Sequence, residues 1–232
     1  MADEQEEQRW IVFGDLLGRI GIVVFFGLGI FGKIRTIFSA IANWQDVAIE
    51  QKQLWMFSQL VVLLFLLTMV SITIFRLRPV KAAQGIEPRI TALAGTYLLG
   101  VLALVPEAAK LPPVFTVVAT VLTIVGFGLS IYVVRWLGRS FSIMAEARRL
   151  VTQGPYAIVR HPLYLTEEIG VIAVVLLNFS PLSVLVLAIQ WALQLRRMHN
   201  EEKVLGAAFP EYAAYAAATP RVIPRLFKSA RA

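Results

Sequence analysis

The sequence predicts an all-α integral membrane protein with about six transmembrane helices, and three observations support this class. Of its 232 residues, 58% are hydrophobic and only 16% are charged, whereas roughly a quarter of the residues of a soluble domain are charged. The mean hydropathy is +0.71. The apolar residues also gather in stretches of the length that crosses a bilayer, roughly 20 residues per helix. A soluble core could not bury so much apolar side chain, so lipid must cover part of it.

The N-terminal region, residues 1–134, is expected to hold the first four spans. Asp15 and Arg19 interrupt the first span and are four residues apart, so they can pair on one helix face. The mixed stretch that follows repeats apolar residues at helical spacing, which predicts a helix lying in the membrane interface. The expected elements are spans at 11–32, 54–75, 90–105 and 114–134, and the interfacial helix near 33–53.

The last apolar region, residues 169–195, has two interpretations. As one span, it would place its basic flanks on opposite sides of the membrane. As a short hairpin turning at Asn178–Pro181, it returns both flanks to one side. The excess of Arg on both flanks favours the hairpin, since basic loops stay in the cytoplasm. Asn, Ser and Pro also favour a turn. The hairpin predicts six crossings, with both termini cytoplasmic.

Charge and composition narrow the partners. The net charge of +7 is typical of membrane topology and of contact with anionic lipids, so no nucleic acid partner is expected. The absence of cysteine excludes disulfides, thiolate zinc sites and cysteine nucleophiles, and with only two histidines no metal site is expected.

The hairpin would bring two polar clusters together on the cytoplasmic side, at residues 148–164 and 196–202. Ionisable groups beside a membrane span are often functional. Glu202 and Arg221 are instead expected to face water or lipid headgroups. Apolar and aromatic residues that recur from Leu205 to Tyr215 predict an amphipathic C-terminal helix.

The motifs Gly154-Pro-Tyr156, Arg160-His-Pro-Leu-Tyr164 and Glu201-Glu202, in this order around an apolar hairpin, resemble the isoprenylcysteine carboxyl methyltransferase family. The related phospholipid N-methyltransferases share the outline. The resemblance covers about residues 136–227 and implies a catalytic region at 135–232. It also implies a membrane-embedded enzyme that uses S-adenosyl-L-methionine, with cytoplasmic amphipathic helices forming the cofactor pocket.

The resemblance also implies site residues. Arg197 matches the family's substrate-contacting arginine, and Arg197 and Glu201 are the expected catalytic residues. The expected cofactor contacts are Glu146, Arg149, Leu150, Val151, Tyr156, His161, Pro162, Leu163, Tyr164 and Glu201.

The side-chain chemistry of these residues agrees with the assignments. Tyr156 or Tyr164 can stack on adenine, and Glu201 can accept charge-assisted hydrogen bonds. Arg197 and Glu201 share a helix face, and arginine grips carboxylates in bidentate fashion. A carboxylate on a lipophilic acceptor is therefore the leading expectation. A lipid N-methyltransferase, a non-catalytic membrane scaffold and, with less support, a transporter are the alternatives.

Overall fold

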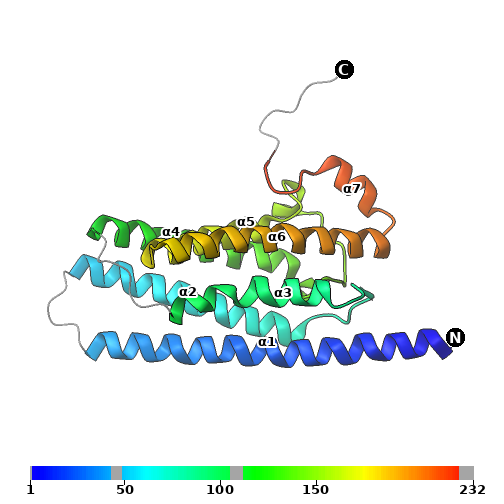
Figure 1. Cartoon of the computed structure of the whole chain (residues 1–232), viewed down its shortest axis with the longest axis horizontal. Coiled ribbons are helices and arrows are strands. Elements are labelled where there is room, and N and C mark those ends of the chain that lie inside the picture. The colour runs from blue at the N-terminus through cyan, green and yellow to red at the C-terminus, as the bar shows by residue number, and fades with distance from the viewer. Residues whose placement is uncertain (1, 43–48, 105–111, 225–232) are drawn as a thin grey trace, which may run out of the picture.

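The computed structural model describes residues 2–42, 49–104 and 112–224. In these ranges the helices run along one long axis (Figure 1). The elements, in chain order, are α1 Ala2–Ala42, α2 Ile49–Phe75, β1 Lys81–Ala82, α3 Glu87–Tyr97, η1 Leu98–Leu104, α4 Pro113–Leu137, η2 Gly138–Ser140, β2 Glu146–Ala147, η3 Gly154–Ala157, α5 Pro162–Leu177, α6 Pro181–Ala208 and α7 Tyr212–Ala218.

The all-α membrane class is confirmed. Three helical segments in the described ranges are long and apolar enough to cross a membrane, Val12–Ala42, Ile49–Phe75 and Pro113–Ser140. Large apolar side chains on them point outward, such as Leu28 at 67% and Phe38 at 68% exposure. Since such surface is costly in water, lipid is its solvent. Six crossings stay a prediction.

The expected interfacial helix at 33–53 is wrong as a separate element. α1 continues through Ala42 without a break, because residues 33–42 contain neither glycine nor proline. Lys33 Nζ donates to Gln59 Oε1 at 2.8 Å, which ties this part of α1 to α2. Residues 43–48 lie outside the described residues, and 49–53 form the start of α2.

Two other boundaries differ from expectation. The span expected at 90–105 is α3 followed by the 3₁₀ helix η1, and its end at Val105, with the linker to Leu111, lies outside the described residues. The C-terminal tail is helical but is not one continuous helix. α6 ends at Ala208 and α7 begins at Tyr212, because Pro210 between them cannot donate a helical hydrogen bond.

The hairpin turn lies where the sequence predicts it. α5 ends at Leu177 and α6 begins at Pro181. Ser180 caps α6: its side chain accepts from Ser183 N at 3.1 Å, and Ser183 Oγ accepts from Ser180 N at 2.9 Å. This reciprocal pair satisfies backbone donors that a helix start leaves free. Pro181 fits the first helical position, where no donor is needed.

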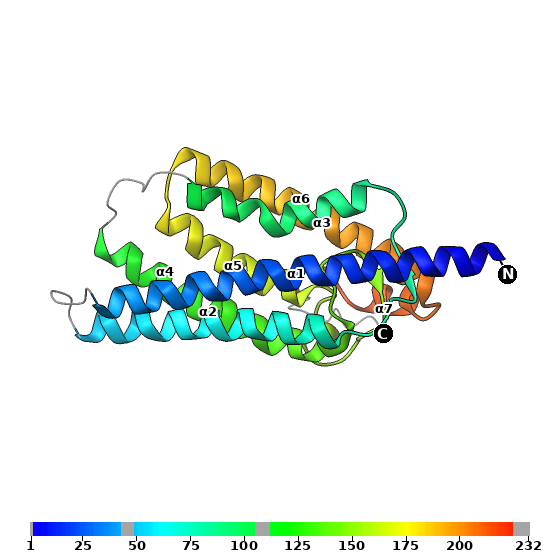
Figure 2. The same ribbon diagram turned by 90° about the horizontal axis from the view of Figure 1, so that it is seen from below.

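Close packing of α4 on α5 forms the centre of the bundle. A Cβ on Gly126 would lie only 2.6 Å from Gly170 N, so the two backbones nearly touch. Ser130 Oγ donates to Thr166 Oγ1 at 2.9 Å across the same contact. Small residues commonly permit such approach in membranes. α1 lies beside α2, and α3 beside α6, in both views (Figures 1 and 2).

One end of the bundle carries the irregular segments. The chain between α4 and α5 gathers there with α7, at the end where α1 begins (Figure 2). The strands β1 and β2 pair antiparallel, with Lys81 opposite Ala147 and Ala82 opposite Glu146. This short ladder fixes the loop before α3 against the loop before α5.

Candidate active site

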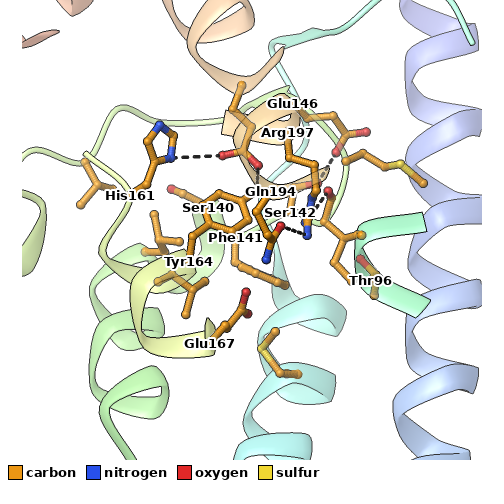
Figure 3. A pocket seen from close by; sticks show the side chains of 18 of the residues that line it. Thr96, Ser140, Phe141, Ser142, Glu146, His161, Tyr164, Glu167, Gln194 and Arg197 are labelled. Atoms are coloured by element: carbon orange, nitrogen blue, oxygen red, sulfur yellow. Dashed lines mark hydrogen bonds and ion pairs between the residues drawn. The ribbon is translucent and has the colours of Figure 1, made fainter. Parts of the chain in front are cut away.

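A cavity of about 320 Å³ extends from the irregular end of the molecule into the helices (Figure 3). Its outer part is lined by residues 140–161 between α4 and α5, 201–205 of α6 and 212–215 of α7. Its inner part is lined by residues 25–26 of α1, 65–69 of α2, 95–99 of α3 and η1, 127 of α4, 167–174 of α5 and 190–194 of α6. Tyr164 and Arg197 stand where the two parts meet. The volume is in the range of small-molecule sites.

The Arg160-His161 segment is fixed by backbone pairing with the chain after α7. Arg160 N donates to Pro220 O at 2.9 Å, and His161 N donates to Arg221 O at 3.0 Å. Pro162 then starts α5, where its fixed φ suits the first helical position. Pro162 does not line the cavity, so among the expected cofactor residues its place is the helix start.

The other expected site residues meet around the cavity. Those that line it are Glu146, Arg149, Leu150, Val151, Tyr156, His161, Leu163, Tyr164, Arg197 and Glu201. The hydroxyl of Tyr164 donates to Glu201 Oε1. The Arg197 guanidinium lies 5.0 Å from the centre of the Tyr164 ring, a cation–π contact. The hairpin therefore brings the two polar clusters together, as expected.

Arg197 is buried, with 8% of its surface exposed. Its Nη1 donates to Gln194 Oε1 at 2.9 Å, and its Nη2 donates to Ile143 O at 3.2 Å. Both terminal nitrogens thus bind the protein itself.

Glu201 is partly buried, with 23% of its side chain exposed. Burial raises its pKa, although the charges of His161 and Arg197 and the Tyr164 hydrogen bond act in the opposite direction. A carboxyl group in this position is well placed to accept hydrogen bonds from a ligand.

Glu202 is largely shielded from water, contrary to the expectation that it faces water. Its side chain is only 12% exposed and contacts Arg160 at 3.3 Å, His161 Nε2 at 3.0 Å and Arg221 Nε at 3.0 Å. Burial acts to raise the pKa of Glu202, but the His161 and Arg221 hydrogen bonds and the Arg160 charge outweigh it and lower the pKa to about 2. Arg221 is accordingly an ion-pair partner of α6 instead of a lipid anchor. Glu202 joins α5, α6 and the chain after α7.

A buried ion cluster fixes the other side of the outer part. Asp15 Oδ1 of α1 lies 2.7 Å from Arg148 Nη2 and 2.6 Å from Arg76 Nη2, and its Oδ2 lies 3.0 Å from Arg19 Nη2, the pair expected from the sequence. Arg148 also binds Glu146, to which Ser142 Oγ donates at 2.7 Å. Glu146 is therefore held by protein groups, next to Arg149, which is exposed at the cavity.

The outer part offers hydrogen-bond donors without partners. Among the described residues, buried atoms that line it and make no hydrogen bond are Ser140 Oγ, Arg148 Nε, Tyr156 OH, Arg160 Nε and Tyr212 OH. Tyr156 is held in place because Tyr215 OH donates to its backbone oxygen at 2.7 Å. Unpaired buried donors are costly, so they indicate a ligand rich in acceptors.

Sequence reasoning missed the polar residues of the inner part, chiefly Glu167, Gln190 and Gln194. A signal was present. Gln190, Gln194, Arg197 and Glu201 follow one another at intervals of four, three and four residues, which places them on one helix face. A polar stripe on an otherwise apolar membrane helix points inward. Glu167 sits on α5 in the same part of the cavity (Figure 3).

Comparisons with known proteins agree with this geometry. Residues 117–207 match the model of the isoprenylcysteine carboxyl methyltransferase family, which confirms the resemblance for this segment. The chain is 41% identical over 78 residues to the cobalt-zinc-cadmium resistance protein CzcN of Cupriavidus metallidurans, covering 33% of this chain and 36% of that protein. It is 35% identical over 82 residues to the nickel-cobalt-cadmium resistance protein NccN of Alcaligenes xylosoxydans xylosoxydans, covering 35% and 38%. The matches thus span little more than a third of each relative.

Proposed function

We propose that this protein, whose residues 117–207 match the model of the isoprenylcysteine carboxyl methyltransferase family, is an integral membrane methyltransferase that uses S-adenosyl-L-methionine to methylate a lipophilic acceptor. One observation carries the proposal. A single cavity joins a polar outer part that contains the family motifs to an inner part among apolar helices. A water-soluble cofactor and a lipophilic acceptor need such a pair of environments in contact.

The outer part fits the cofactor. S-adenosyl-L-methionine, when bound, supplies a methyl group activated by a positively charged sulfur. Its carboxylate, hydroxyls and ring nitrogens match the unpartnered donors of Ser140, Tyr156 and Arg160. Glu201 is placed to accept hydrogen bonds from its hydroxyls or amine. Arg149, Leu150, Val151 and the other expected cofactor residues that line the cavity would enclose it.

The inner part fits the apolar portion of the acceptor. Phe26 and Phe65 lie in a buried apolar cluster, and Phe65 packs on Phe127 with ring centroids 5.0 Å apart. Apolar chains gain free energy on leaving water for such walls. Orientation of the acceptor and exclusion of water are then the main contributions of the protein to methyl transfer.

The membrane placement follows the six-crossing prediction. The basic segments after α2 and α4 and at the end of α6 would face the cytoplasm, with both termini and the outer part of the cavity on that side. The cofactor would enter from the cytoplasm, and the acceptor from the bilayer. Exposed basic residues outside the cavity, such as Arg135 at the end of α4, would contact anionic lipid headgroups.

The test is calorimetric titration of the full-length protein in a neutral detergent with S-adenosylhomocysteine. We expect saturable binding. Glu201→Ala should weaken it about 10- to 100-fold, since a hydrogen bond to a charged group contributes roughly 1.5–3 kcal/mol. Glu211→Ala is the matched control, because Glu211 is exposed and does not line the cavity. Folded wild-type protein that binds nothing at saturating concentration would leave a non-catalytic membrane scaffold as the better description.

A further inference from the structure

The inner part of the cavity contains hydrogen-bond acceptors without donors. Glu167 lines it and makes no hydrogen bond or ion pair with any described residue. Gln190 Nε2 donates to Gly95 O at 2.9 Å, and this leaves Gln190 Oε1 buried without a partner in the described chain. Figure 3 shows Glu167 below Tyr164 and Gln194 in the view. A ligand that donates hydrogen bonds would satisfy both groups.

Arg197 is less available than the sequence suggests. Its Nη1 and Nη2 already donate to Gln194 and to Ile143 O, and its side chain lies over the Tyr164 ring. Of its three nitrogens only Nε lacks a hydrogen bond within the described residues. Two of the five N–H groups of the guanidinium therefore already have acceptors in the protein, and both terminal nitrogens are held in place by them.

The carboxyl groups of the two parts of the cavity also differ in how far protein groups pair with them. Glu201 is engaged by the Tyr164 hydroxyl, and Glu202 is paired with Arg160 and Arg221. Glu167 forms no close ion pair in the described chain; it interacts with the positive charge of Arg197 and with the negative charges of Glu168 and Glu201, so carboxyl groups outnumber the cation around it. A carboxylate placed beside it would be repelled, strongly so away from water, whereas an ammonium would be attracted.

We propose that the methyl acceptor is a primary or secondary amine at the polar end of a lipophilic chain, and that Glu167 is the catalytic residue that binds its ammonium form and accepts its proton. Gln190 Oε1 accepts a second N–H from the same group. This inference rests on the proposed methyltransferase function and specifies its acceptor.

The proposed methyl transfer conserves protons and electron pairs. An alkyl amine has a pKa near ~10 and is protonated at neutral pH, so its nitrogen has no free electron pair. Glu167 accepts one proton and leaves a neutral amine. The nitrogen electron pair then forms the N–C bond to the methyl group of S-adenosyl-L-methionine, the C–S bond breaks, and sulfur keeps that electron pair. The product is a methylated ammonium and a neutral thioether, and Glu167 returns its proton to water.

The first experiment measures binding without the cofactor. Full-length protein in a neutral detergent is titrated with dodecylamine and with dodecanoate, which share one tail length and differ in the sign of charge. Wild type should bind dodecylamine at least tenfold more tightly. Glu167→Gln should remove this preference, while Glu211→Gln should keep it, since Glu211 is exposed and does not line the cavity. Equal binding, tighter binding of dodecanoate, or an unchanged preference in Glu167→Gln would overturn the proposal.

The second experiment identifies the bond that is formed. Protein is incubated with S-adenosyl-L-methionine carrying a labelled methyl group and with dodecylamine, lysophosphatidylethanolamine or dodecanoate. The two amines separate a free lipophilic amine from a lipid headgroup. Label in an N-methyl group survives mild base, whereas a methyl ester releases labelled methanol. Base-stable product supports the amine, and base-labile product refutes it while leaving the methyltransferase proposal intact. No labelled product with any acceptor, together with no S-adenosylhomocysteine binding, refutes the proposed function itself.

The pH profile separates proton transfer from a structural role. In Glu167→Gln the rate with dodecylamine should rise about tenfold per pH unit between pH 7 and 9, as the free amine fraction grows. Wild type should show a flatter profile. Parallel profiles would show that Glu167 does not accept the proton.

Discussion

The outer and inner parts of the cavity are built from different stretches of the chain. The outer part comes from the loop between α4 and α5, the end of α6 and α7, and most of it lies within residues 117–207, which match the family model. Much of the inner part comes from α1, α2 and α3, which precede that match. In the described chain, buried donors without partners line the outer part, whereas the inner part holds the unpartnered Gln190 Oε1 and the carboxyl group of Glu167.

Because of this difference, the family match bears on the proposed cofactor site more fully than on the proposed acceptor site. The family match applies to the segment that would hold the cofactor. The chamber for the acceptor is lined by residues such as Phe25, Phe65 and Thr96 that lie outside it. The proposed acceptor site combines these walls with Glu167 and Gln190, which lie within the match, so the proposal of an amine rests on this chain's own residues from both sides of that boundary.

The largest effect is expected where the two regions are joined, at Asp15. Asp15→Ala leaves Arg76 buried without a carboxylate partner and leaves Arg148 with Glu146 alone, so it should destabilise the fold by about 3–5 kcal/mol and disorder the loop that begins the outer part. Thermal unfolding in detergent measures this. Arg19→Ala is the control, because Arg19 is 25% exposed and should cost about 1 kcal/mol or less. Equal losses would show that the cluster is not a specific link between α1 and the loop.

The next effect concerns the outer part and is dependent on pH. Glu202 has a folded-state pKa of about 2 against an ordinary value of 4.5. Its contribution to stability is therefore complete above about pH 5 and is lost as the pH falls from 4.5 toward 2. Glu202→Gln should lower stability at pH 7 by roughly 1.5–3 kcal/mol and flatten the acid limb of a plot of melting temperature against pH. A variant with the wild-type acid limb would exclude this role.

The wall shared by α4 and α5 is sensitive to a single methyl group. In Gly126→Ala the new Cβ would lie 2.6 Å from Gly170 N, and backbone cannot move aside cheaply. We expect a loss of about 1–3 kcal/mol from overpacking. Gly128→Ala on the same helix meets nothing within 4 Å and should be neutral or stabilising. Denaturant titration of both variants decides the point, and similar stabilities would contradict the close contact.

The smallest expected change distinguishes the inner part from the outer part directly. In Gly95→Ala the new Cβ would lie 2.9 Å from Arg197 Cδ and would displace that side chain. We expect kcat/KM for the acceptor to fall about tenfold, or ~1.4 kcal/mol, with less than threefold change in S-adenosylhomocysteine affinity. Gly100→Ala, which meets nothing within 4 Å, is the control. If cofactor affinity fell as far as acceptor turnover, the two parts would not be separable.

Much of the fold follows from local sequence. The apolar stretches predict spans at α2 and α4, and the turn chemistry of Asn178 to Pro181 predicts the hairpin, because helix length and turn formation depend on neighbouring residues. The helix boundary expected after Gly32 is wrong. A change in polarity does not end a helix when no glycine or proline interrupts it, and the hydrogen bond from Lys33 to Gln59 holds this part of α1 against α2.

Local sequence patterns predict the membrane class, the hairpin and the motif residues that line the outer part. The packing of the helices is needed to show that Asp15 binds Arg148, 133 residues away, that Glu202 lies among three cationic or basic groups, and that Glu167 lines the cavity without a hydrogen bond to the described residues. Helix formation and burial in lipid depend on residue type and spacing, which a sequence displays. The pairing of charges depends on which helices pack together, and this is a property of the assembled chain.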